Sequence, residues 1–165
     1  MNELSAPRAV FDCMVFLQGA ARETSPAKAC LNLVEKGIVE LCLSRTILSE
    51  IKDVLTRPET QKKFPSLTLA VVEEFLHCIT TQSVLHLNVP EEYKFARDPK
   101  DEPYINLALI ARANYLVTRD TDLLDLMNES MDEGRAFRFR YPFLIILDPV
   151  TFLGRIAAHQ SRNIG

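Results

Sequence analysis

The chain has 165 residues, of which 47% are hydrophobic and 25% charged, a composition that excludes a disordered protein and predicts one soluble domain over residues 1–165. Its formal net charge of -3 argues against nucleic-acid binding through the overall charge of the protein, but it does not exclude a local basic surface that binds nucleic acid. No window approaches the roughly 18 apolar residues of a membrane span, and the N-terminal apolar run lacks a basic leader, so we expect a cytoplasmic protein.

Apolar residues recur at strand and helix spacing along the chain. In order, the pattern predicts a strand at 8–11, a helix at 26–36, a strand at 38–43, helices at 45–55 and 66–80, a strand at 83–87, a helix at 103–114, a strand at 115–118, a helix at 121–127, a strand at 143–147 and a helix from 149. This alternation favours a three-layer α/β/α sandwich with a mainly parallel central sheet of about five strands.

The segment from 97 to 122 places acidic residues around an otherwise apolar helix and strand. These residues are Asp98, Asp101, Glu102, Asp120 and Asp122. Pro103 suits the first turn of a helix, and Asp101 or Glu102 just ahead of it can cap that helix or complement its dipole. Asp120 follows the predicted strand at 115–118, at the edge where open parallel sheets place their ligands.

Two acidic residues earlier in the chain can reach the same edge. Asp12 follows the first strand, where an aspartate is often a turn residue or a helix N-cap. Glu50 lies at the margin of the apolar stripe of the helix at 45–55, where it could also snorkel or meet an arginine. Because parallel strands end at one edge, we expect Asp12 and Asp120 to be neighbours, with Asp101 and Glu50 beside them.

Such a group of carboxylates must bind protons, cations or both. Each like-charged pair at about 4 Å costs on the order of 4 kcal/mol at an effective dielectric near 20. Oxygen ligands without a set of cysteines or histidines favour Mg²⁺ or Mn²⁺ over zinc. This site suits hydrolysis of a phosphodiester by metal-activated water, whereas the chain has no P-loop, G-x-G-x-x-G or G-x-S-x-G motif for other chemistries.

Four motifs in the same order resemble the PIN-domain family, specifically its bacterial toxin components of toxin–antitoxin pairs. The motifs are V-F-D near the N-terminus, S-E-I, D-P-K-D-E ahead of an L-A-L helix, and L-V-T-R-D-T-D-L-L. The resemblance runs from residue 9 to about residue 153, and its most specific part is 98–124. It implies an endoribonuclease that uses Mg²⁺ or Mn²⁺ to hydrolyse RNA, with an antitoxin protein or a second copy of the chain as a partner.

The resemblance also implies roles for individual residues. The catalytic acids of the family correspond to Asp12, Glu50, Asp101 and Asp120, with Asp98 and Asp122 as further metal ligands and Glu102 as an accessory residue. Asp101 and Glu102 compete for the third position, because one residue of slack in the loop shifts the alignment, and we prefer Asp101. Thr118 matches the hydroxyl residue before the last aspartate, which orients a carboxylate or a metal-bound water.

The residues after the first aspartate depart from the family pattern. The family usually has Thr-Asn there, and this chain has Cys13 and Met14. An asparagine side chain can bond both backbone and ligand water, whereas methionine cannot. The alternative function is therefore a weakly active or noncatalytic PIN-like binding module with a degenerate site.

The segment at 128–143 is a second departure. Arg135, Arg138 and Arg140 alternate there with aromatic residues. Alternating arginine and aromatic side chains can grip phosphates and stack bases, so RNA contact is one hypothesis. An edge hairpin with solvated arginines, or a surface for a dimer or an antitoxin, is the other.

Overall fold

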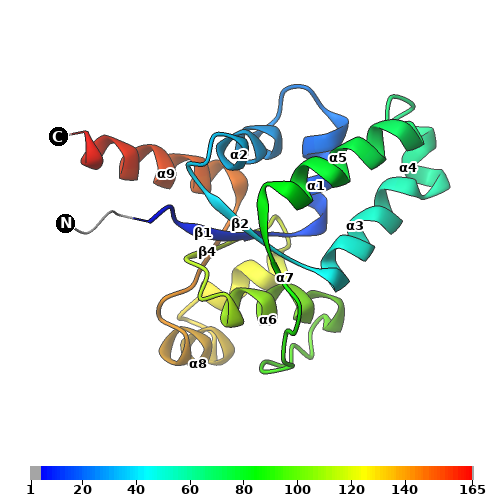
Figure 1. The fold of residues 1–165 in the computed structure, drawn as a ribbon. Helices are drawn as coiled ribbons and strands as arrows, with labels where there is room; N and C mark the ends of the chain where they lie inside the picture. The colour runs from blue at the N-terminus through cyan, green and yellow to red at the C-terminus, as the bar shows by residue number, and fades with distance from the viewer. Residues whose placement is uncertain (1–4, 165) are drawn as a thin grey trace.

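The computed structural model describes residues 5–164, and its centre is a parallel sheet (Figure 1). The strands are β1 (Arg8–Phe11), β2 (Glu40–Ser44), β3 (Ser83–His86), β4 (Tyr115–Val117) and β5 (Ile145–Leu147). They lie in the order β3-β2-β1-β4-β5, and every neighbouring pair is parallel. The predicted parallel sheet of five strands is therefore confirmed.

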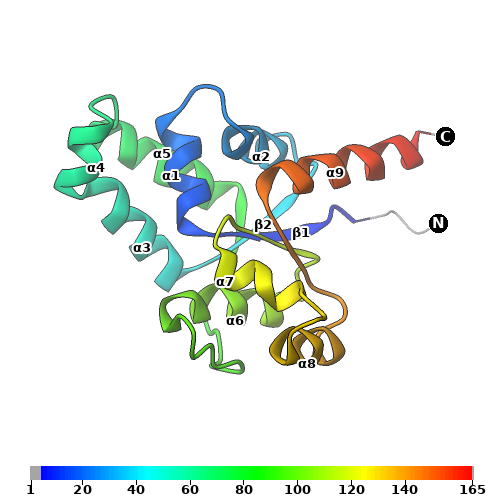
Figure 2. The same cartoon turned by 180° about the vertical axis from the view of Figure 1, so that it is seen from behind.

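Helices cover both faces of this sheet. They are α1 (Cys13–Ala21), α2 (Pro26–Glu35), α3 (Arg45–Thr56), α4 (Pro58–Lys63), α5 (Leu69–Thr81), α6 (Glu102–Ile110), α7 (Thr121–Leu124), α8 (Asp132–Arg140) and α9 (Pro149–Asn163), with 3-10 turns η1 (Pro99–Asp101) and η2 (Asp125–Met127). Helices α1, α2, α5 and α9 lie on one side of the strands and α6, α7 and α8 on the other (Figures 1 and 2). None of these helices has the length and apolar character needed to cross a membrane.

The central strands β1 and β4 set the position of the candidate site. Ala9, Val10 and Phe11 are completely buried, and the Phe11 ring packs against the ring of Phe152 from α9 at 5.8 Å between centroids. The register aligns Phe11 with Val117. The residues that follow β1 and β4 therefore arrive side by side at the carboxyl edge of the sheet.

The helix expected to run to residue 114 ends earlier, at Ile110. Its C-terminus is closed by two backbone bonds, from Arg112 N to Leu109 O at 3.2 Å and from Ala113 N to Ala108 O at 2.9 Å. This pattern needs a left-handed residue after the helix, and Arg112 supplies it with a φ of 51°. Glycine usually occupies such a position, so an arginine there does not signal the early end of the helix.

The edge hairpin that was one alternative for residues 128–143 does not form, because residues 132–140 form α8. Phe137 is buried and packs edge-on against Tyr93, with ring centroids 5.2 Å apart, whereas Phe139 points outward and is 90% exposed. A helix places these two residues about 200° apart, which explains the difference. Acidic residues in the first turn and arginines in the last turn also complement the helix dipole.

Candidate metal centre

Asp12 joins the end of β1 to the start of α1. One carboxylate oxygen accepts a hydrogen bond from the backbone N of Val15 at 3.1 Å, which caps α1, a helix that the sequence analysis did not place. The other oxygen accepts a hydrogen bond from the hydroxyl of Thr118, which is completely buried. Burial raises the pKa of Asp12, and these hydrogen bonds oppose that rise. Asp12 is thus both a helix cap and a fixed carboxyl group at the sheet edge.

Thr118 also fixes the turn that carries Asp120. The backbone N of Asp120 donates to the Thr118 hydroxyl oxygen at 2.9 Å, and the Asp120 carboxylate accepts from the backbone N of Asp122 at 2.8 Å. The second bond makes Asp120 the N-cap of α7. One hydroxyl group therefore ties the residue after β1 to the turn after β4.

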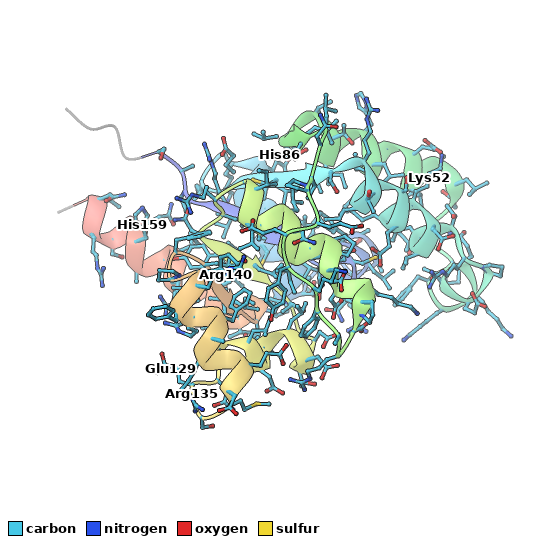
Figure 3. All side chains as sticks on the ribbon, turned by 90° about the horizontal axis from the view of Figure 1, so that it is seen from below. Lys52, His86, Glu129, Arg135, Arg140 and His159 are labelled. Atoms are coloured by element: carbon cyan, nitrogen blue, oxygen red, sulfur yellow. The ribbon has the colours of Figure 1, made fainter. Side chains whose placement is uncertain are left out.

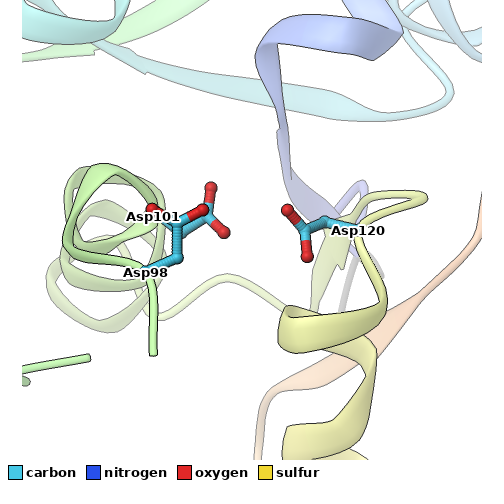
Figure 4. Close-up of side chains that lie close together, drawn as sticks. All are labelled: Asp98, Asp101 and Asp120. Carbon is cyan, nitrogen blue, oxygen red and sulfur yellow. The ribbon is translucent and has the colours of Figure 1, made fainter. Parts of the chain in front are cut away.

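Asp98 and Asp101 come from the turn that precedes α6. With Asp120 they form the aspartate triad, in which one carboxylate oxygen of each residue lies within 4.8 Å of the others. Figure 4 shows Asp98 and Asp101 on one wall and Asp120 facing them from the other. The Oδ2 atom of Asp101 is buried and has no hydrogen-bond partner among residues 5–164. A buried acceptor left without a donor is the environment that a cation would satisfy.

The electrostatics of the triad favour binding of a positive charge. Burial, followed by the nearby charges of Asp120, Asp98 and Asp12, raises the pKa of Asp101 to about 7. Near neutral pH a proton on Asp101 therefore competes with a cation for the site. Three carboxylates with no histidine or cysteine in the group match the oxygen ligands that Mg²⁺ and Mn²⁺ prefer.

Glu50 lines the same cavity but stands apart from the triad. The acidic cavity, as we call it, has a volume of about 470 Å³ and is lined by five carboxyl groups, those of Asp12, Glu50, Asp98, Asp101 and Asp120. The hydroxyl of Tyr104 donates a hydrogen bond to Glu50 Oε2 at 2.8 Å. Tyr104 belongs to α6 and is 2% exposed, so it holds Glu50 from a rigid, buried position. Sequence reasoning missed Tyr104, because 54 positions separate it from its partner.

We expect Tyr104→Phe to lower the rate of any reaction in this cavity by about 10-fold while leaving Mn²⁺ affinity of the triad within about twofold. A hydrogen bond to a charged group contributes roughly 1.5–3 kcal/mol, and phenylalanine keeps the ring packing. The check is a comparison of kcat, KM and Mn²⁺ affinity for the wild type and the variant. A variant with weaker Mn²⁺ binding and unchanged kcat would contradict this role.

Comparison with known proteins places this geometry in a family. The sequence-family model of the PIN domain matches residues 8–122, a segment that contains all five carboxyl groups of the acidic cavity. The chain belongs to the PIN-domain family. No curated protein and no solved structure matches the chain. PIN domains are commonly metal-dependent nucleases, and the acidic cluster of this chain fits a metal site.

Two acidic residues expected at the site are engaged elsewhere in this PIN domain. Asp122 forms an ion pair with Arg97 at 2.7 Å and does not line the acidic cavity. Glu102 accepts a hydrogen bond from the backbone N of Phe95 at 2.8 Å and lines a different cavity. Asp101, rather than Glu102, faces Asp98 and Asp120.

The three arginines of α8 lie away from the acidic cavity. Arg135 pairs with Asp132, Arg138 lies 3.4 Å from Glu129 and Arg140 lies 4.0 Å from Glu92. Figure 3 shows Arg135 and Glu129 together beside α8. None of the three arginines lines the cavity. Helix α8 leads to the start of β5, whereas Asp12 and Asp120 follow the ends of β1 and β4. Their contact with RNA or with a partner protein stays a hypothesis, without support from the position of the site.

Proposed function

We propose that this PIN domain is an endoribonuclease that uses Mg²⁺ or Mn²⁺ to hydrolyse RNA phosphodiester bonds. The observation that carries the proposal is the Oδ2 atom of Asp101, which is buried within a triad of aspartates and has no hydrogen-bond partner among the residues described. A site with this composition has no obvious structural purpose, since unrelieved repulsion between carboxylates destabilises a fold. Its placement at the carboxyl edge of a parallel sheet, in an open cavity, is typical of a reaction site.

The residues of the acidic cavity divide into two tasks. Asp98, Asp101 and Asp120 would hold the cation, with Asp12 beside them, and Thr118 keeps Asp12 and the Asp120 turn in place. A bound divalent cation supplies an activated water and neutralises charge on the phosphate. Glu50, fixed through Oε2 by Tyr104, is available to orient a water or an RNA hydroxyl.

Cleavage of single-stranded RNA by the purified chain tests this function. We expect a labelled RNA to be cut at internal positions in Mn²⁺ or Mg²⁺ and to stay intact after chelation with EDTA, because the carboxylates alone repel the phosphate backbone. Cutting that persists in EDTA would point to a contaminating metal-independent ribonuclease. An intact RNA under all metal conditions would remove the proposal.

We further propose that the chain is the toxin component of a toxin–antitoxin pair, acting on cytoplasmic RNA. The support is the order of motifs shared with that bacterial group, and an antitoxin or a homodimer is the partner that this role requires. Growth of a bacterial host during expression of the chain, compared with expression of Asp120→Asn, tests it. Growth arrest by both forms would count against an RNA-cleaving toxin.

A noncatalytic binding module is the second candidate function, and Met14 is the observation that favours it. Met14 lines the acidic cavity and is 48% exposed, and its neighbour Cys13 is buried. Neither side chain supplies the hydrogen bonds of the Thr-Asn pair that is usual in the family.

We expect Met14→Asn to raise cleavage about 10-fold, because an amide at this exposed position can orient water in the cavity at a gain near that of one hydrogen bond. The measurement is the initial rate at saturating Mn²⁺. Met14→Leu, which restores no polar group, serves as the control. If Met14→Asn cuts no faster than the wild type, the departure at this position does not limit activity.

A further inference from the structure

Two positively charged side chains that line the acidic cavity have no role in the metal site. Lys100 and Arg119 line the cavity, and both side chains are exposed. Each is a neighbour in sequence of a triad aspartate, yet within residues 5–164 neither forms an ion pair. Arg57 lines the same cavity but is held by Asp53 at 2.7 Å. Lys100 and Arg119 are therefore free to meet a ligand.

The cavity is larger than a hydrated cation requires. Six waters around one ion fill roughly 180 Å³, at about 30 Å³ for each water. The cavity measures about 470 Å³, so more than half of it remains for another group. The five carboxyl groups outweigh the charge of one divalent cation. A negatively charged group in the remaining space would therefore need positively charged side chains beside it.

The placement of the two cations suits a chain of phosphates. Lys100 belongs to the turn that carries Asp98 and Asp101, and Arg119 directly precedes Asp120. These two segments form the facing walls in Figure 4. A phosphate next to the one at the metal would otherwise be repelled by the carboxylates, whereas ammonium and guanidinium groups attract it.

Two of the five carboxyl groups place oxygen atoms deep in the cavity, which bears on the form of the nucleic acid that can reach them. Asp12 is 7% exposed, and the Oδ2 atom of Asp101 is buried. A reacting phosphate must therefore enter the cavity, and a flexible single strand can bend into it more readily than a regular duplex can. We propose that Lys100 and Arg119 bind backbone phosphates of single-stranded RNA on either side of the reacting phosphate. This inference rests on the proposed ribonuclease function and names the residues that select its substrate.

The test is the binding of a fluorescein-labelled single-stranded RNA of 12 nucleotides, followed by fluorescence anisotropy in Ca²⁺, with gels to show that the RNA stays intact. Each phosphate contact on a single strand releases about 0.7 counterion. If wild type and variant have the same Kd when extrapolated to 1 M salt, Lys100→Gln and Arg119→Gln should each raise the Kd at 100 mM salt about fivefold. The double variant should lower the slope of log Kd against log salt by about 1.4. Mn²⁺ affinity, measured by electron paramagnetic resonance, should change less than twofold.

The control is Arg155→Gln, an exposed arginine on α9 that also has no ion pair among the residues described. The inference would be overturned if Arg155→Gln weakened RNA binding as much as the two variants do, or if the double variant kept the salt slope of the wild type. It would also be overturned if the wild type bound a duplex of the same sequence equally well or bound no RNA, or if the variants lost much of their Mn²⁺ affinity. RNA bound through Lys100 and Arg119 but left uncut in Mn²⁺ would support the inference and remove the ribonuclease function. RNA cleavage in Mn²⁺, together with RNA binding by the variants at wild-type affinity, would support the ribonuclease function and overturn the inference.

Discussion

We expect Asp120→Asn to lower the rate of RNA cleavage by about 1,000-fold in saturating Mn²⁺. Asp120 supplies one wall of the triad, and its carboxylate lies within 4.8 Å of those of Asp98 and Asp101. Loss of a charged ligand removes several kcal/mol of metal-dependent stabilisation of the transition state, and roughly 4 kcal/mol corresponds to that factor. The measurement is the single-turnover rate on a labelled single-stranded RNA.

This variant separates chemistry from folding. Asparagine caps helices as well as aspartate does, so the bond from the backbone N of Asp122 is retained. The fold, followed by circular dichroism and by Tm without metal, should therefore stay intact. Asp122→Asn is the matched control, because Asp122 is paired with Arg97 outside the cavity, and we expect it to cut within about threefold of the wild type. Asp120→Asn protein that cuts normally would show that the reaction occurs elsewhere.

We expect saturating Mn²⁺ to raise the Tm of the protein by about 5–10 °C at pH 8, with a smaller gain toward pH 6. A ligand at about 100 times its Kd stabilises the folded state by roughly 2.7 kcal/mol, and a domain of this size gains about 2–4 °C per kcal/mol. The gain depends on pH because a proton on Asp101, whose pKa is raised to about 7, competes with the cation.

Without metal, Asp101 acts on stability in the opposite direction. Its pKa is about 7 in the folded protein and 3.8 ordinarily, so between these values the folded state binds the extra proton. The contribution of Asp101 to stability is therefore complete below pH 3.8 and is lost as the pH rises through 7. The metal-dependent gain and the metal-free contribution should thus run in opposite directions between pH 6 and about 8.

Differential scanning calorimetry across this pH range, with Mn²⁺ or with EDTA, measures both trends. Asp101→Asn is the control: it should abolish most of the Mn²⁺ gain and flatten the pH dependence, because the amide neither titrates nor repels its neighbours. A Mn²⁺ gain that is equal at pH 6 and pH 8 would contradict the coupling of metal to this carboxyl group.

The sequence predicted the five strands and most of the helices, although not α1, α4 or α8, because hydrophobic periodicity is a local property. The strand at 8–11 and the helix after Ser44 appear where their apolar patterns place them. The predictions failed where a distant contact chose between local possibilities. Within the segment 128–143, residues 132–140 form α8, in which Phe137 packs against Tyr93. The helix before β4 ends at Ile110, where Arg112 adopts a left-handed conformation.

For the site, the sequence by itself determined that Asp12 and Asp120 lie near one another, because residues after parallel strands share an edge whatever their side chains do. Only the tertiary structure decided the partners of each carboxylate. Tyr104 bonds to Glu50, Arg97 pairs with Asp122, and the backbone of Phe95 bonds to Glu102. Within the described part of the chain, Oδ2 of Asp101 has no hydrogen-bond partner. The physical reason is that chain topology fixes where a residue starts, whereas the contacts made by its side chain depend on segments far away in the sequence.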